Sequence, residues 1–393
     1  MSEPIVIVSA ARTPIGSLNG SLSSLSASAL GQAVIMECIK RAKVDPADVS
    51  EVIMGQTLTA GGGQNPARQA SMNSGIPYTV PAFTVNQLCG SGLKAIFLGY
   101  QSIQTGDSKI VVCGGQESMS QAPHYVHIRS SVRMGNITLT DSMLNDGLTD
   151  AFDNVHMGIT AENIASEHGI SRAEQDKFST ASQKKAEEAL KDGHFRDEIV
   201  KIEIKTRKGV EVVDSDEFPR PGTTEEKLAA LKPVFKKDGT VTAGNAAGIN
   251  DGAAAVLLMS LNEAKKYGCT PMAKILAFAQ VGIDPKFMGL GPINAIKKLL
   301  EKVGWEVDDV DLFELNEAFA AQSIAVIQNL GIKPSKVNVS GGAIALGHPI
   351  GASGARILIT LLYALRRTNS KRGVAALCIG GGMGIAVAVE LMS

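Results

Sequence analysis

Two thiols and one imidazole stand in glycine-rich turns that are far apart in the sequence. Cys89 lies in NQLCGSGLKAI, His348 in GGAIALGHPIGASGAR and Cys378 in ALCIGGGMG. A cysteine can accept an acyl group as a thioester, and an imidazole can remove the proton of a thiol, so this trio indicates covalent acyl chemistry. The run that follows Cys89 predicts a helix that opens beside it. The positive end of the helix dipole favours a thiolate there, and we expect Cys89 to be a nucleophile of lowered pKa.

The other three cysteines favour structural roles. Cys38 lies in the amphipathic stretch AVIMECIKRA, Cys269 in a Tyr-Gly-Cys-Thr-Pro turn, and Cys113 ends the apolar run KIVVCGG. An odd and sparse cysteine count argues for a reducing compartment rather than a disulfide framework. A redox-sensing role for Cys89 and Cys378 stays open as an alternative, because low-pKa thiols in an open site oxidise readily.

Composition restricts the classes of partner. The chain has 393 residues, 44% hydrophobic and 20% charged, with a formal net charge of −1. This predicts a soluble globular protein of two or three packed units. No basic tract suits a nucleic acid or an anionic membrane, and no apolar run has transmembrane length, so we expect a small-molecule partner. The N-terminal segment enters a strand almost at once and leaves no room for a targeting peptide, which predicts a cytoplasmic protein.

An internal repeat predicts the architecture. CGSGLKAI at residues 89–96 aligns with GASGARIL at residues 351–358, so that Ser91 pairs with Ser353 and Gly92 with Gly354. Each copy continues as a helix into an apolar strand that ends in glycines. We therefore predict an α/β protein of two duplicated halves. The nearly unbroken apolar strands predict largely parallel sheets with helices on both faces.

The repeat and the composition together predict three domains. The segment between about Met119 and Asn250 holds most charge runs and turn clusters, including SRAEQDKFSTASQKKAEEALK, which predicts Ser-capped helices. We predict an N-terminal half at 1–118, completed by 249–268, and a C-terminal half at 269–393. Residues 119–248 form an inserted loop domain between them, where a large ligand can bind.

Eight motifs in a fixed order resemble those of the thiolases. They are NQLCGSGLKAI, GGQESMS, DGLTDAF, HMGITAEN, TAGNAAGINDGAAA, NEAFAAQ, GGAIALGHPIGASGAR and CIGGGMG. The resemblance spans the whole chain and is strongest to the biosynthetic acetyl-CoA acetyltransferase branch. It implies a five-layered αβαβα fold of two similar halves, a loop domain that binds coenzyme A, and a homotetramer.

The resemblance also implies a reaction and the residues that perform it. Two acetyl-CoA molecules condense reversibly to acetoacetyl-CoA and CoA through an acetyl-Cys89 intermediate. His348 would activate Cys89, and Cys378 would remove the α-proton of the second acetyl-CoA, as a thiolate whose pKa lies near the pH of use.

Two oxyanion sites are implied as well. Asn316, acting through an ordered water, and His348 would stabilise the enolate. The backbone N–H groups of Cys89 and Gly380 would stabilise the tetrahedral adduct. For Asn316, the sequence leaves open the role of an N-cap for a helix that begins near EAFAAQ.

The coenzyme A contacts are carried over from the same resemblance. Met157 would also narrow the acyl pocket against longer chains. The matching positions are Leu148, His156, Met157, Arg220, Lys227, Phe235, Ala243, Ala247, Ala318 and Phe319.

Four positions depart from the motifs of the resembled proteins. Ala247 stands where a serine commonly contacts the pantetheine arm, so coenzyme A binding is expected to be weaker. Gln116 replaces a methionine, and Lys227 replaces a small polar residue near the adenine side. Gln183 replaces the tyrosine of potassium-activated members, so no alkali-metal site is expected. No zinc-type or EF-hand motif occurs. We predict no metal and no cofactor, with coenzyme A as substrate and product.

Two other classes of function stay open. A ketoacyl-synthase-type condensing enzyme shares the duplicated fold but pairs its cysteine with two histidines, or with a histidine and an asparagine; here Cys378 occupies the second position. A non-catalytic acyl-CoA or lipid carrier would have lost Cys89 or His348, and both are present.

Overall fold

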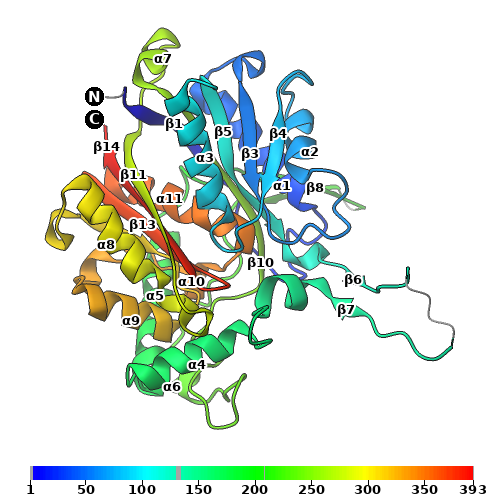
Figure 1. Cartoon of the computed structure of the whole chain (residues 1–393), viewed down its shortest axis with the longest axis vertical. Helices are drawn as coiled ribbons and strands as arrows, with labels where there is room; N and C mark the ends of the chain where they lie inside the picture. The colour runs from blue at the N-terminus through cyan, green and yellow to red at the C-terminus, as the bar shows by residue number, and fades with distance from the viewer. Residues whose placement is uncertain (1–2, 130–133, 208, 393) are drawn as a thin grey trace.

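Strands of two repeated halves make up the centre of the molecule. The computed structural model describes residues 3–129, 134–207 and 209–392 (Figure 1). The strands of the large sheet are β1 (Ile5–Arg12), β2 (Gly16–Ser17), β3 (Glu51–Gly55), β4 (Ala82–Val85), β5 (Ile110–Ser118), β10 (Asn250–Ser260), β11 (Ala273–Gly282), β12 (Leu312–Leu315), β13 (Arg372–Ile379) and β14 (Met383–Leu391). The helices are α1 (Ala27–Ala42), α2 (Pro66–Asn73), α3 (Ser91–Thr105), α4 (Met157–Glu167), α5 (Arg172–Lys191), α6 (Glu225–Ala229), α7 (Leu261–Lys266), α8 (Gly291–Val303), α9 (Ala320–Leu330), α10 (Ala343–Leu346) and α11 (Ile350–Arg367).

The strand order shows the duplication. One half runs β1-β10-β5-β3-β4, and the other runs β11-β14-β13-β12 in the same sense. β12 corresponds to β3. Val337 forms a bridge with Phe313 of β12, at the position that β4 has next to β3. The halves join through a short antiparallel pairing of β1 with β11. The predicted duplication is therefore confirmed, and β10 pairs with both β1 and β5.

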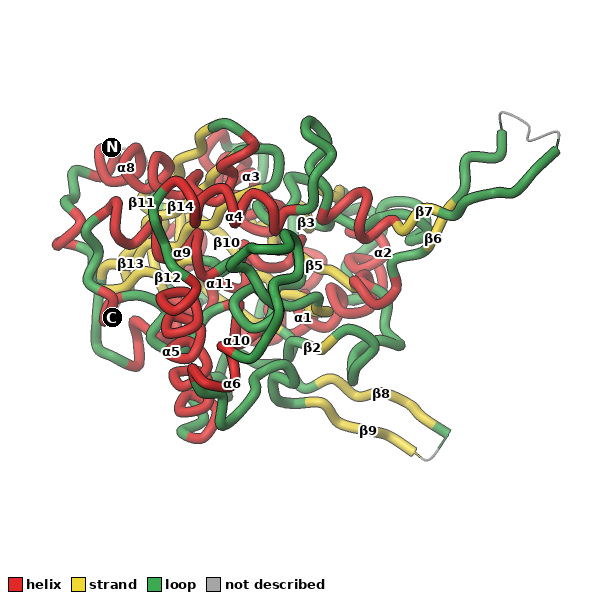
Figure 2. Tube along the Cα trace, turned by 90° about the horizontal axis from the view of Figure 1, so that it is seen from below, coloured by secondary structure: helices red, strands yellow, loops and turns green. Residues whose placement is uncertain are grey.

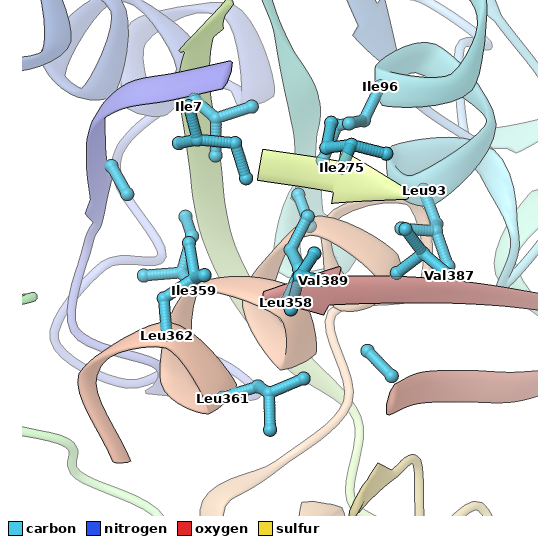
Figure 3. Packing of buried hydrophobic residues seen from close by; sticks show 14 of the residues in the cluster. Ile7, Leu93, Ile96, Ile275, Leu358, Ile359, Leu361, Leu362, Val387 and Val389 are labelled. Carbon is cyan, nitrogen blue, oxygen red and sulfur yellow. The ribbon is translucent and has the colours of Figure 1, made fainter. Parts of the chain in front are cut away.

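Helices and strands alternate in five layers: outer helices, the strands of one half, two middle helices, the strands of the other half, and outer helices again. α1 and α2 pack on the outer face of the first half, and α8 and α9 pack on the outer face of the second. α3 and α11 lie between the halves, where Leu93 and Leu358 pack among side chains of β1, β11 and β14 (Figure 3). Side chains of each strand alternate between the layers: Ala254, Val256 and Leu258 of β10 face the middle layer, while the residues between them face α1.

The prediction of largely parallel sheets is wrong. Among the named strands of the large sheet, β3 pairs in parallel with β4 and with β5, and β12 pairs in parallel with β13. The other pairs between these named strands are antiparallel. A strand with helices on both faces is apolar on both faces whatever its direction. Continuous apolar runs therefore indicated burial correctly and carried no information about direction.

The two middle helices cross at the glycines that the internal repeat pairs. A Cβ atom on Gly92 would lie 2.8 Å from the backbone nitrogen of Ala355, and one on Gly354 would lie 2.5 Å from the backbone nitrogen of Leu93. No side chain fits at either position. The crossing brings the start of α3, next to Cys89, against the start of α11, next to His348.

The segment between β5 and β10 contains the elements outside the two repeated halves. These are the β6–β7 arm (His124–Tyr125 and Thr140–Asp141), the π-helical turn Met143–Leu148, helices α4 to α6, and the β8–β9 hairpin (Ile202–Thr206 and Gly209–Val213) (Figure 2). Ser171 caps α5 in a capping box with Glu174, as the sequence predicted. Arg12 of β1 anchors this segment through buried ion pairs with Glu198 (2.6 Å) and Asp216 (2.7 Å). The exact domain boundaries stay a prediction.

Candidate active site

Cys89 lies in a tight turn between a strand and a helix. Leu88, the residue before it, has a φ of 48°, which is uncommon for a branched side chain and costs on the order of 1 kcal/mol or more. The turn is held by backbone bonds from Gly90 to Gln87 (3.0 Å) and from Ser91 to Leu88 (3.0 Å). Helix α3 begins at Ser91, so Cys89 lies just before its N-terminal end.

His348 lies in the matching turn of the second half. Gly347 precedes it with a φ of 103°, and a Cβ there would lie 2.5 Å from Asn250 Cγ, so only glycine fits. The Asn250 side chain accepts from His348 N (2.9 Å) and donates to the Gly16 carbonyl (3.0 Å). His348 Nε2 lies 3.4 Å from Cys89 Sγ. The structure therefore brings the predicted nucleophile and base together across the contact of the two halves.

The expectation of a lowered pKa for Cys89 is wrong. Burial raises the pKa of the Cys89 thiol to about 11, although the backbone N–H groups of Gly380 and of Cys89 itself favour the anion. Burial also lowers the pKa of His348 to about 4, and the charge of Arg356 adds to this effect. Loss of hydration thus outweighs the helix dipole. The resting pair is a neutral thiol and a neutral imidazole, which does not favour the redox-sensing alternative.

This neutral pair predicts how alkylation of Cys89 depends on pH. Only the thiolate reacts with iodoacetamide, so the rate at Cys89 should rise by about tenfold per pH unit between about pH 6.5 and about pH 9.5. Peptide mapping of timed samples separates Cys89 from the other four cysteines. A rate that is flat over this range would indicate a thiolate–imidazolium pair and would contradict the assignment.

Cys378 packs directly against side chains that line the cavity. Its side chain is completely buried on β13 in an apolar cluster with Met157, Met288 and Phe319. Burial raises the pKa of Cys378 well above its usual value, and a negative charge on nearby Cys89 would raise it further. The two sulfurs are therefore neighbours, but the expected pKa near the pH of use is wrong for the resting state.

Asn316 follows β12 and is not a helix cap. Helix α9 begins at Ala320 with Phe319 in the N-cap position, which excludes the structural alternative for Asn316. The Asn316 side chain is 1% exposed, and its Nδ2 lies 3.5 Å from His348 Nδ1. Its Oδ1 has no hydrogen-bond partner within the described part of the chain. A buried amide with an unpaired atom can bind an ordered water beside the imidazole.

A cavity of about 680 Å³ leads to Cys89, His348 and Gly380. Nine of the ten predicted coenzyme A contacts line it: Leu148, His156, Met157, Arg220, Phe235, Ala243, Ala247, Ala318 and Phe319. The sequence did not indicate Met119, Ile249, Met288 or Ile350, which line the same cavity. Lys227 is not among the lining residues, since it lies on α6, exposed, with its Nζ 2.7 Å from the Gly222 carbonyl.

Stacked rings form one wall of the cavity. His156 and Phe235 stack with centroids 4.5 Å apart, and Phe235 meets Phe319 edge-on. His156 Nδ1 accepts from Gly158 N (3.0 Å) and caps α4, so its Nε2 carries the proton when the ring is neutral. The wall thus offers flat apolar surface with one donor.

Replacing Gly158 with alanine should disturb this wall and weaken substrate binding. The added Cβ would lie 2.2 Å from the Phe235 ring, which must then leave the His156 stack. Losing one aromatic contact of about 1 kcal/mol predicts a KM raised by about fivefold for acetyl-CoA, the substrate that the sequence leads us to expect, with kcat nearly unchanged. Steady-state kinetics test this, with exposed Ser166 of the same helix changed to alanine as control. An unchanged KM would show that this wall does not contact the substrate.

Sequence reasoning missed two buried residues that hold the reactive turns. Glu117 accepts from Thr57 N (3.0 Å), Leu58 N (3.1 Å) and Gly351 N (2.8 Å), and so ties β5 to the start of α11. Burial raises its pKa to about 7 despite these bonds. Asn250 is the other, through its bond to His348. Their motifs, GGQESMS and GINDG, were noted, but nothing in the sequence shows which distant backbone a side chain will reach.

Other predicted features concern metals and membranes. The Gln183 side chain accepts from Arg220 N (3.0 Å) and donates to the Ile344 carbonyl (3.4 Å). Within residues 3–129, 134–207 and 209–392, no cluster of three or more His, Cys, Asp or Glu side chains suits a metal ion. The absence of a metal and a cofactor stays a prediction. In the same ranges no helix has the length and apolar character needed to cross a membrane.

Comparison with known proteins agrees with the fold. Residues 5–262 match the thiolase N-terminal domain, and residues 269–391 match the thiolase C-terminal domain. A cytosolic acetyl-CoA acetyltransferase of Mus musculus is 58% identical over 99% of this chain and 98% of its own length, and an acetyl-CoA acetyltransferase of Allochromatium vinosum is 57% identical over the whole of both.

Solved structures give the same result. The Bacillus anthracis acetyl-CoA acetyltransferase superposes with a TM-score of 0.98 at 43% identity, covering 100% of this chain and 99% of that one. The human mitochondrial 3-ketoacyl-CoA thiolase superposes with a TM-score of 0.96 at 45% identity, covering 99% of each chain. Two matching domains, full-length relatives and a shared fold establish that this chain belongs to the thiolase family.

Proposed function

We propose that the protein is an acetyl-CoA acetyltransferase that joins two acetyl-CoA molecules reversibly into acetoacetyl-CoA and CoA. The observation that carries this proposal is the 3.4 Å approach of His348 Nε2 to Cys89 Sγ at a cavity lined by Met157, Phe235 and Arg220. Relatives that are at least 55% identical over nearly their full length bear the name acetyl-CoA acetyltransferase, which supports the same substrate.

In the first half-reaction, Cys89 becomes acetylated. His348 Nε2 takes the thiol proton while the sulfur attacks the thioester carbon of acetyl-CoA. The backbone N–H groups of Cys89 and Gly380 converge on the sulfur, and they can stabilise the oxyanion that forms beside it. When the carbon–sulfur bond to CoA breaks, the CoA thiolate takes the proton from His348. The products are acetyl-Cys89 and CoA, with His348 neutral again.

In the second half-reaction, Cys378 acts as the base. Transfer of its proton to His348 leaves a thiolate and an imidazolium, and the imidazolium donates through Nε2 to the thioester oxygen of a second acetyl-CoA. The thiolate removes the α-proton, with Asn316 and a water supporting the enolate. The enolate carbon attacks acetyl-Cys89, and the Cys89 thiolate leaves. It takes the Nε2 proton of the His348 imidazolium, so that Cys89, Cys378 and His348 are all neutral again. Burial opposes this proton transfer in the resting site, so the bound thioester oxygen must favour it.

The cavity favours a short acyl group on a long carrier. Met119, Ile350 and Leu148 pack with Cys89, and Met157 and Met288 line the same cavity. Arg220 is exposed at the cavity and supplies a cation for a phosphate group. Ala247 has no side-chain donor, so the pantetheine arm is held there by backbone and apolar contacts.

The test is turnover of acetoacetyl-CoA with CoA, followed by chromatography of the thioesters. We expect two acetyl-CoA for each acetoacetyl-CoA consumed. Binding of CoA without turnover would favour the non-catalytic carrier instead. Release of carbon dioxide from malonyl-CoA, with condensation, would favour a ketoacyl-synthase-type enzyme.

We further propose a homotetramer in the cytoplasm. The β6–β7 arm extends from the body (Figure 2), and Ile128, Met134, Ile137 and Leu139 along it are at least 47% exposed. Such apolar side chains on a projecting arm suit burial against a second copy.

The cytoplasmic location is supported by the name of the Mus musculus relative, which includes the word cytosolic. Light scattering that gives the mass of one chain would contradict the assembly, and recovery in a membrane or organelle fraction would contradict the location.

A further inference from the structure

A buried hydroxyl lies next to the imidazole of His348. Ser353 Oγ, in the first turn of α11, is 2.5 Å from His348 Nδ1 and 2.9 Å from the carbonyl oxygen of Pro349. Ser353 is 1% exposed, so bulk water does not compete for these contacts. We propose that Ser353 is a positioning residue that keeps the hydrogen of neutral His348 on Nδ1, so that the Nε2 lone pair faces Cys89. The proposal rests on the proposed role of His348 as the base.

The direction of the hydrogen bonds follows from the donors available. A serine hydroxyl has one hydrogen, and a carbonyl oxygen can only accept. A serine in a helix commonly donates to the carbonyl four residues earlier, which here is Pro349. Ser353 Oγ is then left to accept from His348, so Nδ1 must carry a hydrogen. Cys89 Sγ–H donates to Nε2, Nδ1–H donates to Ser353, and Ser353 O–H donates to Pro349, so every donor in the chain has an acceptor.

In the opposite tautomer, with the hydrogen on Nε2, the ring N–H of His348 has no good acceptor. A hydrogen on Nε2 would face the neutral thiol of Cys89, whose sulfur is a weak acceptor. Burial keeps both groups neutral at pH 7, so no thiolate is present to accept it. The other neighbour of Nδ1 is Asn316 Nδ2, which as a donor would favour a bare Nδ1. It lies at 3.5 Å, at the limit of a hydrogen bond, and the contact of Nδ1 with Ser353 Oγ is far shorter. Ser353 therefore decides the tautomer.

A fixed Nδ1–H suits both half-reactions. With Nδ1 always protonated, His348 gains and loses a proton only at Nε2, which faces Cys89 Sγ. As a neutral ring it accepts from Cys89, and as an imidazolium it donates to the enolate oxygen. Ser353 can accept from Nδ1–H in both states without rotating.

The duplicated half supplies a matched control. Ser91 is the counterpart of Ser353 in the internal repeat and lies in the first turn of α3. Its hydroxyl donates to the Leu88 carbonyl (2.7 Å) and accepts from Gln87 N (2.8 Å), and no imidazole is among these partners. Ser91→Ala removes an equivalent buried hydroxyl without touching the ring of His348.

The experiment is ¹⁵N magic-angle-spinning NMR of the full-length protein labelled at histidine, at neutral pH. The signal of His348 is assigned by its loss in His348→Asn. We expect Nδ1–H in the wild type and in Ser91→Ala, a mixture or Nε2–H in Ser353→Ala, and recovery of Nδ1–H in Ser353→Thr. Ser353→Ala should also slow acetylation of Cys89 by about tenfold, as the competent tautomer loses population.

Two results would overturn the proposal. One is Nε2–H in the wild type, and the other is a Ser353→Ala spectrum identical to that of the wild type. Failure of the proposed function would be seen separately, because it would leave wild-type Cys89 without an acetyl adduct whatever the tautomer of His348.

Discussion

Replacing Cys89 with alanine is expected to lower the rate of acetoacetyl-CoA thiolysis by about 10⁴-fold or more. Each half-reaction forms or breaks a bond to this sulfur, and removal of the nucleophile of a covalent enzyme leaves only binding and the oxyanion donors. Cys89→Ser should lose nearly as much, because a hydroxyl is far less acidic than a thiol and His348 is a weak base in this site. Both variants should still bind CoA, as measured by calorimetry.

A matched change at another thiol separates the chemistry from general damage. Cys269 is half-buried in the turn between α7 and β11, outside the cavity lining. Cys269→Ala should keep kcat and KM within about twofold of the wild type. If Cys89→Ala kept more than about one hundredth of the activity, direct transfer between two bound thioesters would replace the acetyl-cysteine route.

Replacing Cys378 with alanine should preserve acetylation of Cys89 by acetyl-CoA and strongly slow the condensation step. Acetyl transfer from acetyl-CoA to Cys89 needs His348 but not Cys378, so an acetyl adduct should still form. Condensation should fall by about 10²- to 10⁴-fold, the usual contribution of a general base. With acetoacetyl-CoA the same variant should acetylate slowly, because cleavage of the carbon–carbon bond releases an enolate that Cys378 must protonate.

The comparison of the two acyl donors is the measurement for this variant. Quenched-flow mass spectrometry follows the adduct on Cys89 from each donor. Cys113→Ala is the control, since it removes another completely buried thiol, on β5, from a position that does not line the cavity. Equal rates from acetyl-CoA and acetoacetyl-CoA in Cys378→Ala would mean that another group is the acid and base.

The sequence was most informative where one local pattern determines one local structure. The Ser171–Glu174 capping box starts α5, and the Ser91-Gly92 and Ser353-Gly354 pairs mark the two turns that meet in the site. The long apolar runs correctly predicted strands with helices on both faces. Their directions could not be predicted, because burial on two faces produces the same composition in parallel and antiparallel strands.

Electrostatic properties depended on the fold and were not accessible from the motifs. The position of Cys89 before α3 suggested a thiolate, but burial raises the pKa of this thiol instead.

The contacts of individual side chains were not predictable either. Lys227 stands at a position that the resemblance assigns to coenzyme A binding, yet the structure places it outside the cavity lining. The contact of Ser353 with His348 was also missed, although the internal repeat had already singled out this serine.

Acyl transfer through acetyl-Cys89 can be tested by detecting the acetylated protein itself. Wild type and Cys89→Ala are mixed briefly with acetyl-CoA, quenched in acid and examined by intact-protein mass spectrometry, with peptide mapping of any adduct. We predict one acetyl group on the wild type, located on Cys89, and none on the variant. An unmodified wild type that still binds CoA, or an acetyl group on a different residue, would contradict the account.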